Sequence, residues 1–187
     1  MAAGEILLPG EVVLHPRESY TSPDLYLNHA IGLDGVAARF HDHVRHNLHP
    51  LAPDRPVSLN VWEAVYFDQN LDKLITLADR AAAVGVERYV VDDGWFGSRR
   101  DDRSGLGDWT VSPDVWPNGL HPLVNHVKSL GMQFGLWFEP EMVNEDSDLA
   151  RNHPDWLMAP GERLPRQWRH QQVLNLTIPQ AWQYIHD

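Results

Sequence analysis

Residues 88–96 have the sequence RYVVDDGWF, an apolar stretch that runs into two adjacent aspartates and a glycine. A short apolar run bounded by a turn signal is typical of a buried β-strand. Before it, apolar residues recur at three-and-four spacing over residues 71–84, which predicts a helix that ends at Gly85. This part of the chain therefore predicts a helix followed by a buried strand that ends in two carboxylates.

The same alternation continues on both sides of this unit. Residues 57–62 predict an earlier strand. Residues 120–130 predict a second helix, which ends at Gly131, and residues 134–138 predict the next strand. Apolar strands joined by helices are typical of parallel β/α units. A barrel and an open doubly wound sheet both carry functional residues at the carboxyl ends of such strands, but no glycine-rich phosphate loop opens a helix here, which favours the barrel.

The predicted fold class is α/β, with a partial (β/α)8 TIM barrel in residues 57–187. A complete barrel needs about 250 residues, so this segment has enough chain for about three to four strands. Residues 32–56 predict a linker helix and a loop, because apolar residues at helical spacing are followed by several prolines. Residues 5–30 predict short β-strands that prolines interrupt.

The composition is that of a globular chain with an excess of acidic residues. The 187 residues include 26 acidic and 15 basic side chains, which give a formal net charge of −11. This charge argues against nucleic acid or an anionic membrane as a partner. There is no export signal and no long apolar run, so we expect a cytoplasmic protein without a membrane partner. Because cysteine is absent, we expect no disulfide and no cysteine-based zinc site; no other metal or cofactor is indicated.

Asp92 and Asp93 are the first candidates for a functional role. Two adjacent carboxylates at the end of an apolar strand are costly to bury unless they are hydrogen-bonded. Sugar hydroxyl groups are donors that such carboxylates can accept. Aspartate is also common in turns and helix caps, and Asp-Gly is a frequent turn pair, so the residues alone leave both interpretations open.

Tryptophan gives a second signal, because the sequence contains eight of them and three lie at the ends of predicted strands, at Trp62, Trp95 and Trp137. A flat aromatic ring can stack on the apolar face of a pyranose. A single buried tryptophan more commonly fills a core. Three at one edge of a sheet, beside acidic residues, favour a carbohydrate cleft.

Glu139 and Glu141 form a second acidic pair, after the third predicted strand. Glycoside hydrolysis uses two carboxyl groups, about 5 to 5.5 Å apart in retaining enzymes, which makes this pair a candidate. The interpretation that we favour is structural, with the pair bound by Arg99, Arg100 or another arginine. Arg169 can donate forked hydrogen bonds to ring hydroxyls or to a carboxylate.

Several motifs resemble, in order and spacing, those of the melibiase-type α-galactosidases of glycoside hydrolase family 36. They are NVWEA at 60–64, DDGWFG at 92–97, LGDW at 106–109, PNGL at 117–120, GLWFEPEMV at 135–143 and HPDW at 153–156. The resemblance implies three segments of chain. Residues 1–31 are similar to the end of an N-terminal β-sandwich domain, residues 32–56 to a linker, and residues 57–187 to the first part of a catalytic barrel.

The resemblance also implies which residues bind the sugar. Carried over by position, the residues of the galactose pocket are Trp62, Asp92, Asp93, Trp137 and Arg169. The aspartate pair would hold the axial 4-hydroxyl and the 6-hydroxyl, where galactose is distinguished from glucose. The family's Lys-Trp-Asp nucleophile motif and its acid/base motif do not occur in this sequence, so no catalytic residue is assigned and this chain alone is expected to be inactive.

The activity that the resemblance implies is hydrolysis of terminal α-galactosyl residues with retention, without a metal or cofactor. Melibiose and raffinose-type sugars are the expected substrates, and the parent enzyme is expected to be a homo-oligomer. Two alternatives remain: a galactosyl-transferring enzyme of the raffinose synthase type, and a non-catalytic galactose-binding fragment.

Overall fold

The computed structural model describes residues 4–7, 10, 12–47, 54–159, 161 and 163–187. The chain forms two compact units, Met1–Arg55 and Pro56–Asp187. No helix within the described ranges is long and apolar enough to span a membrane.

In the first unit, the predicted helix is confirmed as α1 (Gly32–Asn47). The strands predicted in residues 5–30 are wrong, since the described residues of this range form no strand. A strand needs a neighbour for its backbone N–H and C=O groups. This segment instead makes side-chain contacts, such as the 2.6 Å hydrogen bond from Tyr20 Oη to Glu5 Oε2. The assignment of residues 1–31 to a β-sandwich stays a prediction, and part of the predicted linker, residues 48–53, lies outside the described residues.

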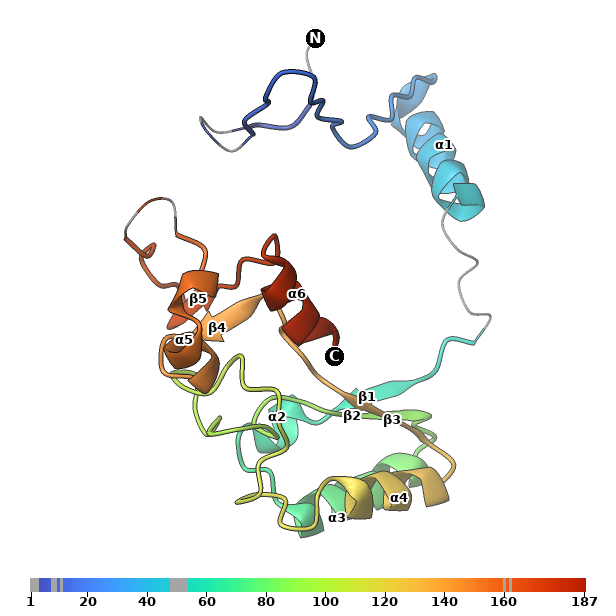
Figure 1. Ribbon diagram of the computed structural model, residues 1–187. Helices are drawn as coiled ribbons and strands as arrows, with labels where there is room; N and C mark the ends of the chain where they lie inside the picture. Colours follow the sequence, from blue (N-terminus) through green and yellow to red (C-terminus); the bar gives the residue numbers. More distant parts are fainter. Residues whose placement is uncertain (1–3, 8–9, 11, 48–53, 160, 162) are drawn as a thin grey trace. The chain divides into compact units, whose positions relative to one another are not determined.

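The second unit is built on a three-stranded parallel sheet with the order β1-β2-β3 (Figure 1). Its strands are β1 (Ser58–Asn60), β2 (Arg88–Val91) and β3 (Gln133–Leu136). In the register, Leu59 lies opposite Tyr89, and Tyr89 lies opposite Phe134. The parallel pairing confirms the predicted strand and helix alternation. Barrels and open sheets both contain such strands, so the partial barrel stays a prediction.

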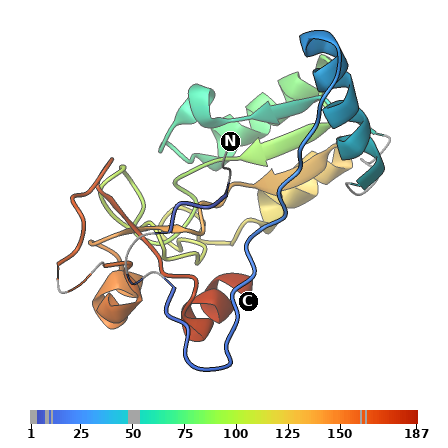
Figure 2. The same cartoon turned by 90° about the horizontal axis from the view of Figure 1, so that it is seen from above.

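Three helices belong to this sheet: α2 (Trp62–Val65), α3 (Leu71–Ala83) and α4 (His121–Ser129). Helices α3 and α4 lie side by side along one face of the sheet (Figures 1 and 2). The core between them and the sheet consists of fully buried side chains, among them Leu74, Ala78, Tyr89, Val91, Leu123 and Val127. Strand β2 is the central strand, so its apolar character follows from contact with neighbours on two edges and on this face.

The remaining elements follow the parallel sheet in the chain. They are β4 (Met142–Asn144), α5 (Asp148–Asn152), the 3-10 helix η1 (Pro154–Trp156), β5 (Gln171–Val173) and α6 (Pro179–His186). Strands β4 and β5 pair antiparallel in a sheet of their own. They share a second, smaller core that includes Val143, Leu149, Leu174 and Ala181.

The long loop between β2 and α4 links the two cores of the second unit. The Asp108 carboxylate accepts hydrogen bonds from the backbone N–H groups of Asp148 and Leu149, both at 2.9 Å. Tyr184 Oη donates to the Gly107 carbonyl at 2.9 Å. These contacts hold the loop against α5 and α6, so the residues that follow β2 lie in a fixed position beside the second core.

Candidate functional site

The parallel register places the carboxyl ends of the three strands at one edge of the sheet. Trp62 begins α2 just after β1, Asp92 and Asp93 follow β2, and Trp137 follows β3. Backbone hydrogen bonds continue beyond the strands, from Val61 N to Val90 O at 3.0 Å and from Trp137 N to Val91 O at 2.9 Å. Four of the five predicted sugar-binding residues are therefore carried by adjacent strand ends.

Asp92 is buried and held by two donors. Its Oδ2 accepts a hydrogen bond from the side-chain amide of Asn60, and its Oδ1 accepts one from the backbone N–H of Asp93 at 2.7 Å. The Asn60 Oδ1 in turn accepts from Trp62 N at 2.8 Å. One amide thus joins Trp62 to Asp92. Each carboxylate oxygen can accept a second hydrogen bond, so Asp92 keeps acceptor capacity for a ligand.

Asp93 forms a buried ion pair with Arg99. Arg99 Nη2 donates to Asp93 Oδ2 at 2.7 Å, and Nε donates to Oδ1 and Oδ2 at 2.9 and 3.1 Å. Only 6% of Asp93 and 1% of Arg99 are exposed. Of the arginines named as partners of Glu139 and Glu141, Arg99 therefore forms its ion pair with Asp93 instead. The chain turns between Gly94 and Arg99, so the Arg99 guanidinium reaches the carboxylate of Asp93, six residues earlier.

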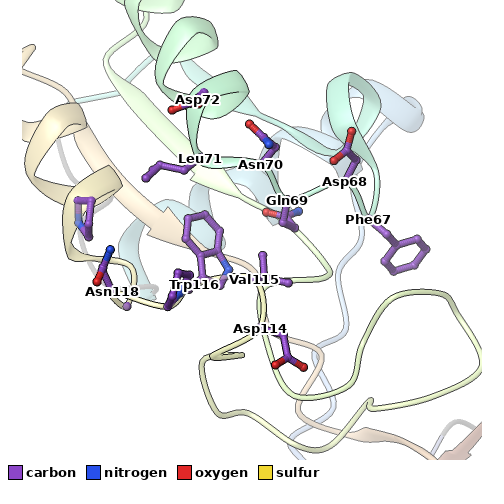
Figure 3. Close-up of a pocket in the computed structure, with 13 residues that line it drawn as sticks. Phe67, Asp68, Gln69, Asn70, Leu71, Asp72, Asp114, Val115, Trp116 and Asn118 are labelled. Atoms are coloured by element: carbon purple, nitrogen blue, oxygen red, sulfur yellow. The ribbon is translucent and has the colours of Figure 1, made fainter.

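Gln69 and Phe67 complete the support of Asp93. Gln69 Nε2 donates to the Asp93 carbonyl at 2.8 Å, and the Arg99 guanidinium lies 5.5 Å from the centre of the Phe67 ring. Gln69 also lines a cleft of about 520 Å³ at the amino ends of α3 and α4, together with Asp72, Asp114 and Trp116 (Figure 3). None of the five predicted sugar-binding residues lines this cleft.

The tryptophans divide into two kinds. Trp95 is 2% exposed, and its indole N–H donates to the Trp137 carbonyl at 3.0 Å, so this ring belongs to the core. Trp62 and Trp137 are partly exposed. Trp62 contacts Phe67 edge to face, with ring centres 5.1 Å apart. The carbohydrate-cleft hypothesis therefore rests on two partly exposed rings at this edge, while the third ring is buried and its N–H binds the Trp137 carbonyl.

Glu139 contacts Gln171 and lies within the electrostatic influence of Arg169. Gln171 Nε2 donates to Glu139 Oε2 at 3.2 Å. Burial raises the pKa of Glu139 above its ordinary value, and the positive charge of Arg169 opposes this shift. Arg169 is exposed, and both it and His170 have left-handed backbone conformations, with φ of 52° and 61°. The charge of Arg169 acts on Glu139, which agrees with the expectation that another arginine interacts with the acidic pair.

Arg100, the other predicted partner of the glutamates, points elsewhere. Its Nη2 donates to Ser112 Oγ, and its Nη1 donates to the carbonyl of Arg99 at 2.6 Å. It therefore braces the loop after β2. Within the described ranges, no group of three or more histidine, aspartate or glutamate side chains is placed to hold a metal ion.

Sequence reasoning missed three residues that orient the candidate site: Asn60, Gln69 and Asn144. Asn60 lies in a quoted motif, but its spacing to Asp92 is 32 residues, so only strand pairing brings the two together. Gln69 and Asn144 likewise contact residues 24 and 45 positions away. For Asn60 the sequence offered one signal, an amide side chain near the end of a predicted strand; Gln69 and Asn144 lie several residues beyond such ends, and no local signal marks them.

Comparison with known proteins identifies the class of this fold and site. An α-galactosidase of Escherichia coli is 50% identical over 98% of this chain and 26% of its own length. The α-galactosidase AgaA of Geobacillus stearothermophilus is 43% identical over 92% of this chain and 24% of its own length. The crystal structure of the GH36 α-galactosidase AgaB from the same organism has a TM-score of 0.76 at 46% identity, covering 82% of this chain and 22% of that one.

The profile of the family described as Melibiase matches residues 19–187. The chain belongs to the Melibiase family. It has an α/β fold similar to GH36 α-galactosidase structures, and it spans about a quarter of the length of the curated relatives that it matches.

Proposed function

We propose that the full-length protein that contains residues 1–187 is a retaining α-galactosidase, and that these residues supply one wall of its galactose pocket. The observation that carries the proposal is the arrangement of two fixed carboxylates, Asp92 and Asp93, beside the partly exposed rings of Trp62 and Trp137. Carboxylates accept hydrogen bonds from sugar hydroxyls, and the aromatic rings contact the apolar face of the sugar.

The relatives support the choice of substrate. Crystal structures of AgaA variants from Geobacillus stearothermophilus contain stachyose, raffinose or 1-deoxygalactonojirimycin. We infer that the present protein acts on terminal α-galactosyl residues in melibiose and raffinose-type sugars. Trp62, Asp92, Asp93, Trp137 and Arg169 are the proposed contacts, and Glu139 and Glu141 support Arg169 and the edge of the pocket.

The distinction between galactose and glucose is proposed to depend on the aspartate pair. Its carboxylates are held in place before any ligand arrives, by Asn60 on one side and Arg99 on the other. A fixed acceptor discriminates strongly between epimers, because a sugar whose hydroxyl points elsewhere leaves one acceptor position of the buried carboxylate unfilled.

The test is the purified full-length protein with nitrophenyl glycosides. We expect hydrolysis of the α-galactoside, little hydrolysis of the α-glucoside, and loss of activity in Asp92→Ala. Arg88→Lys is the control, because Arg88 lies at the other end of β2 and donates to Gln133. Equal hydrolysis of the two glycosides, or full activity in Asp92→Ala, would contradict the proposal. Transfer of galactose to a sugar acceptor in place of water would instead indicate the raffinose synthase type.

A further inference from the structure

Arg99 connects the candidate site to a buried polar network that extends to β4. Besides its forked contact with Asp93, its Nη1 donates to Asn144 Oδ1 at 2.9 Å and to the Ser104 carbonyl at 3.3 Å. A buried guanidinium is stable only when its charge is paired and its donors are satisfied. Because the guanidinium is planar and rigid, its hydrogen bonds hold Asn144 in a set position relative to Asp93.

Asn144 is fully buried, and each of its hydrogen-bonding positions has a partner. Its Oδ1 accepts from Arg99 and from the backbone N–H of Leu106, both at 2.9 Å. Its Nδ2 donates to the His170 carbonyl at 2.8 Å and to the Asp102 carbonyl at 3.3 Å. An amide has two acceptor and two donor positions, so this environment allows one orientation of the side chain.

The far end of the network is the turn that carries Arg169. Arg169 and His170 both have positive φ, a conformation that costs free energy for residues with side chains. Such a turn persists only when its surroundings hold it. Two contacts do so here: the hydrogen bond from Asn144 to the His170 carbonyl, and the bond from Gln171 N to the Trp168 carbonyl at 3.0 Å.

We propose that Arg99 and Asn144 are positioning residues that form a relay between Asp93 and the Arg169 turn, so that the two proposed sugar contacts are held at a set separation. This inference rests on the proposed function, because Asp93 and Arg169 are assigned there as contacts. Asn144 acts on Arg169 through the His170 carbonyl, and Arg99 acts on Asp93 directly.

Asn144→Asp tests the part of the relay between Asn144 and the Arg169 turn. A carboxylate keeps the acceptor for Arg99 and for Leu106 N and adds a negative charge beside Arg99, but it loses the donors to the His170 and Asp102 carbonyls. We expect the dissociation constant of the full-length protein for 1-deoxygalactonojirimycin to rise about tenfold, because the Arg169 turn loses the hydrogen bond from Asn144 to the His170 carbonyl. Asn175→Asp is the matched control. Asn175 Oδ1 accepts hydrogen bonds from Thr177, and a carboxylate oxygen can accept the same bonds.

A double-mutant cycle shows whether the effect passes through Arg169. If it does, Asn144→Asp weakens binding in the wild-type background but has little further effect once Arg169→Ala is present. An equal loss in both backgrounds would overturn the relay, as would unchanged binding in Asn144→Asp. Circular dichroism establishes that each variant is folded before binding is measured.

Hydrogen exchange of the segment 166–173 gives a readout that needs no sugar. We expect faster exchange in Asn144→Asp than in wild type and no change in Asn175→Asp, because the turn loses a contact only in the first. Unchanged exchange would overturn the relay. Faster exchange in a protein that binds no galactoside would leave the relay standing and refute the proposed function instead.

Discussion

The side-chain amide of Asn60, at the end of β1, donates a hydrogen bond to the carboxylate of Asp92, at the end of β2. The same amide accepts from the backbone N–H of Trp62. One side chain therefore sets the position of a proposed acceptor for a sugar hydroxyl relative to a proposed stacking ring.

Replacement of Asn60 by aspartate is expected to weaken galactose binding by about tenfold or more. The change removes the donor to Asp92 and places a second negative charge beside it, while the acceptor for Trp62 N remains. Calorimetry with galactose measures the effect. Asn60→Ala, which adds no charge, should have a smaller effect, and Asn125→Asp on the exposed side of α4 should have none. Equal affinities in wild type and Asn60→Asp would contradict this role.

Asp93→Asn is expected to destabilise the protein by about 3–5 kcal/mol, because it leaves the buried charge of Arg99 without its counter-ion. Asp92→Asn should cost less, since Asp92 is held by Asn60 and a backbone N–H and not by a cation. Urea unfolding of both variants measures the difference. A smaller loss in Asp93→Asn than in Asp92→Asn would show that the ion pair does not contribute as proposed.

Glu139 is expected to make the stability depend on pH. Burial raises the pKa of Glu139 above the ordinary value of 4.5 that applies in the unfolded chain. At pH values between 4.5 and the raised pKa, the folded state binds more protons than the unfolded chain. The free energy of unfolding therefore falls as the pH rises through this window. Glu139→Gln should remove this fall, as measured by urea unfolding from about pH 4 to about pH 7.

The control for this experiment is Glu145, whose pKa is shifted in the opposite direction. The hydrogen bond from Gln172, with one from Gln167, lowers the pKa of Glu145. Its contribution to stability is therefore present above the ordinary value and is lost as the pH falls. Glu145→Gln should accordingly lose stability mainly at the higher pH values. The same pH dependence in both variants would show that the burial of Glu139 has no such effect.

Gly105→Ala is expected to disturb Arg99. A Cβ atom at this position would lie 2.7 Å from Arg99 N and 3.0 Å from Arg99 Cα, and the backbone has a φ of +79°. Gly131→Ala is the matched control, because its φ is +82° and a Cβ there meets nothing within 4 Å. The control should lose about 1–2 kcal/mol from its backbone conformation alone. Gly105→Ala should lose more stability and should also weaken galactose binding, which calorimetry would measure; equal losses in the two variants would rule out the contact.

The sequence alone predicted the elements whose signals are local. Helices α3 and α4 appear where apolar residues recur at helical spacing, and each ends next to a glycine, Gly85 and Gly131, with positive φ. Strand β2 and the two aspartates after it were likewise predicted. Trp62, in contrast, begins a short helix and does not end β1, because the pairing with β2 that defines this strand stops at Asn60.

Only the tertiary structure decided which partner each polar side chain binds. The sequence left Arg99, Arg100 or another arginine as partners of Glu139 and Glu141, whereas in the structure Arg99 binds Asp93 and Asn144. Residues 5–30 have the composition of strands, yet those that the structure describes form none. The reason is common to both cases. Periodicity records which face of an element is buried, whereas a hydrogen bond between residues far apart in the chain depends on how the elements pack.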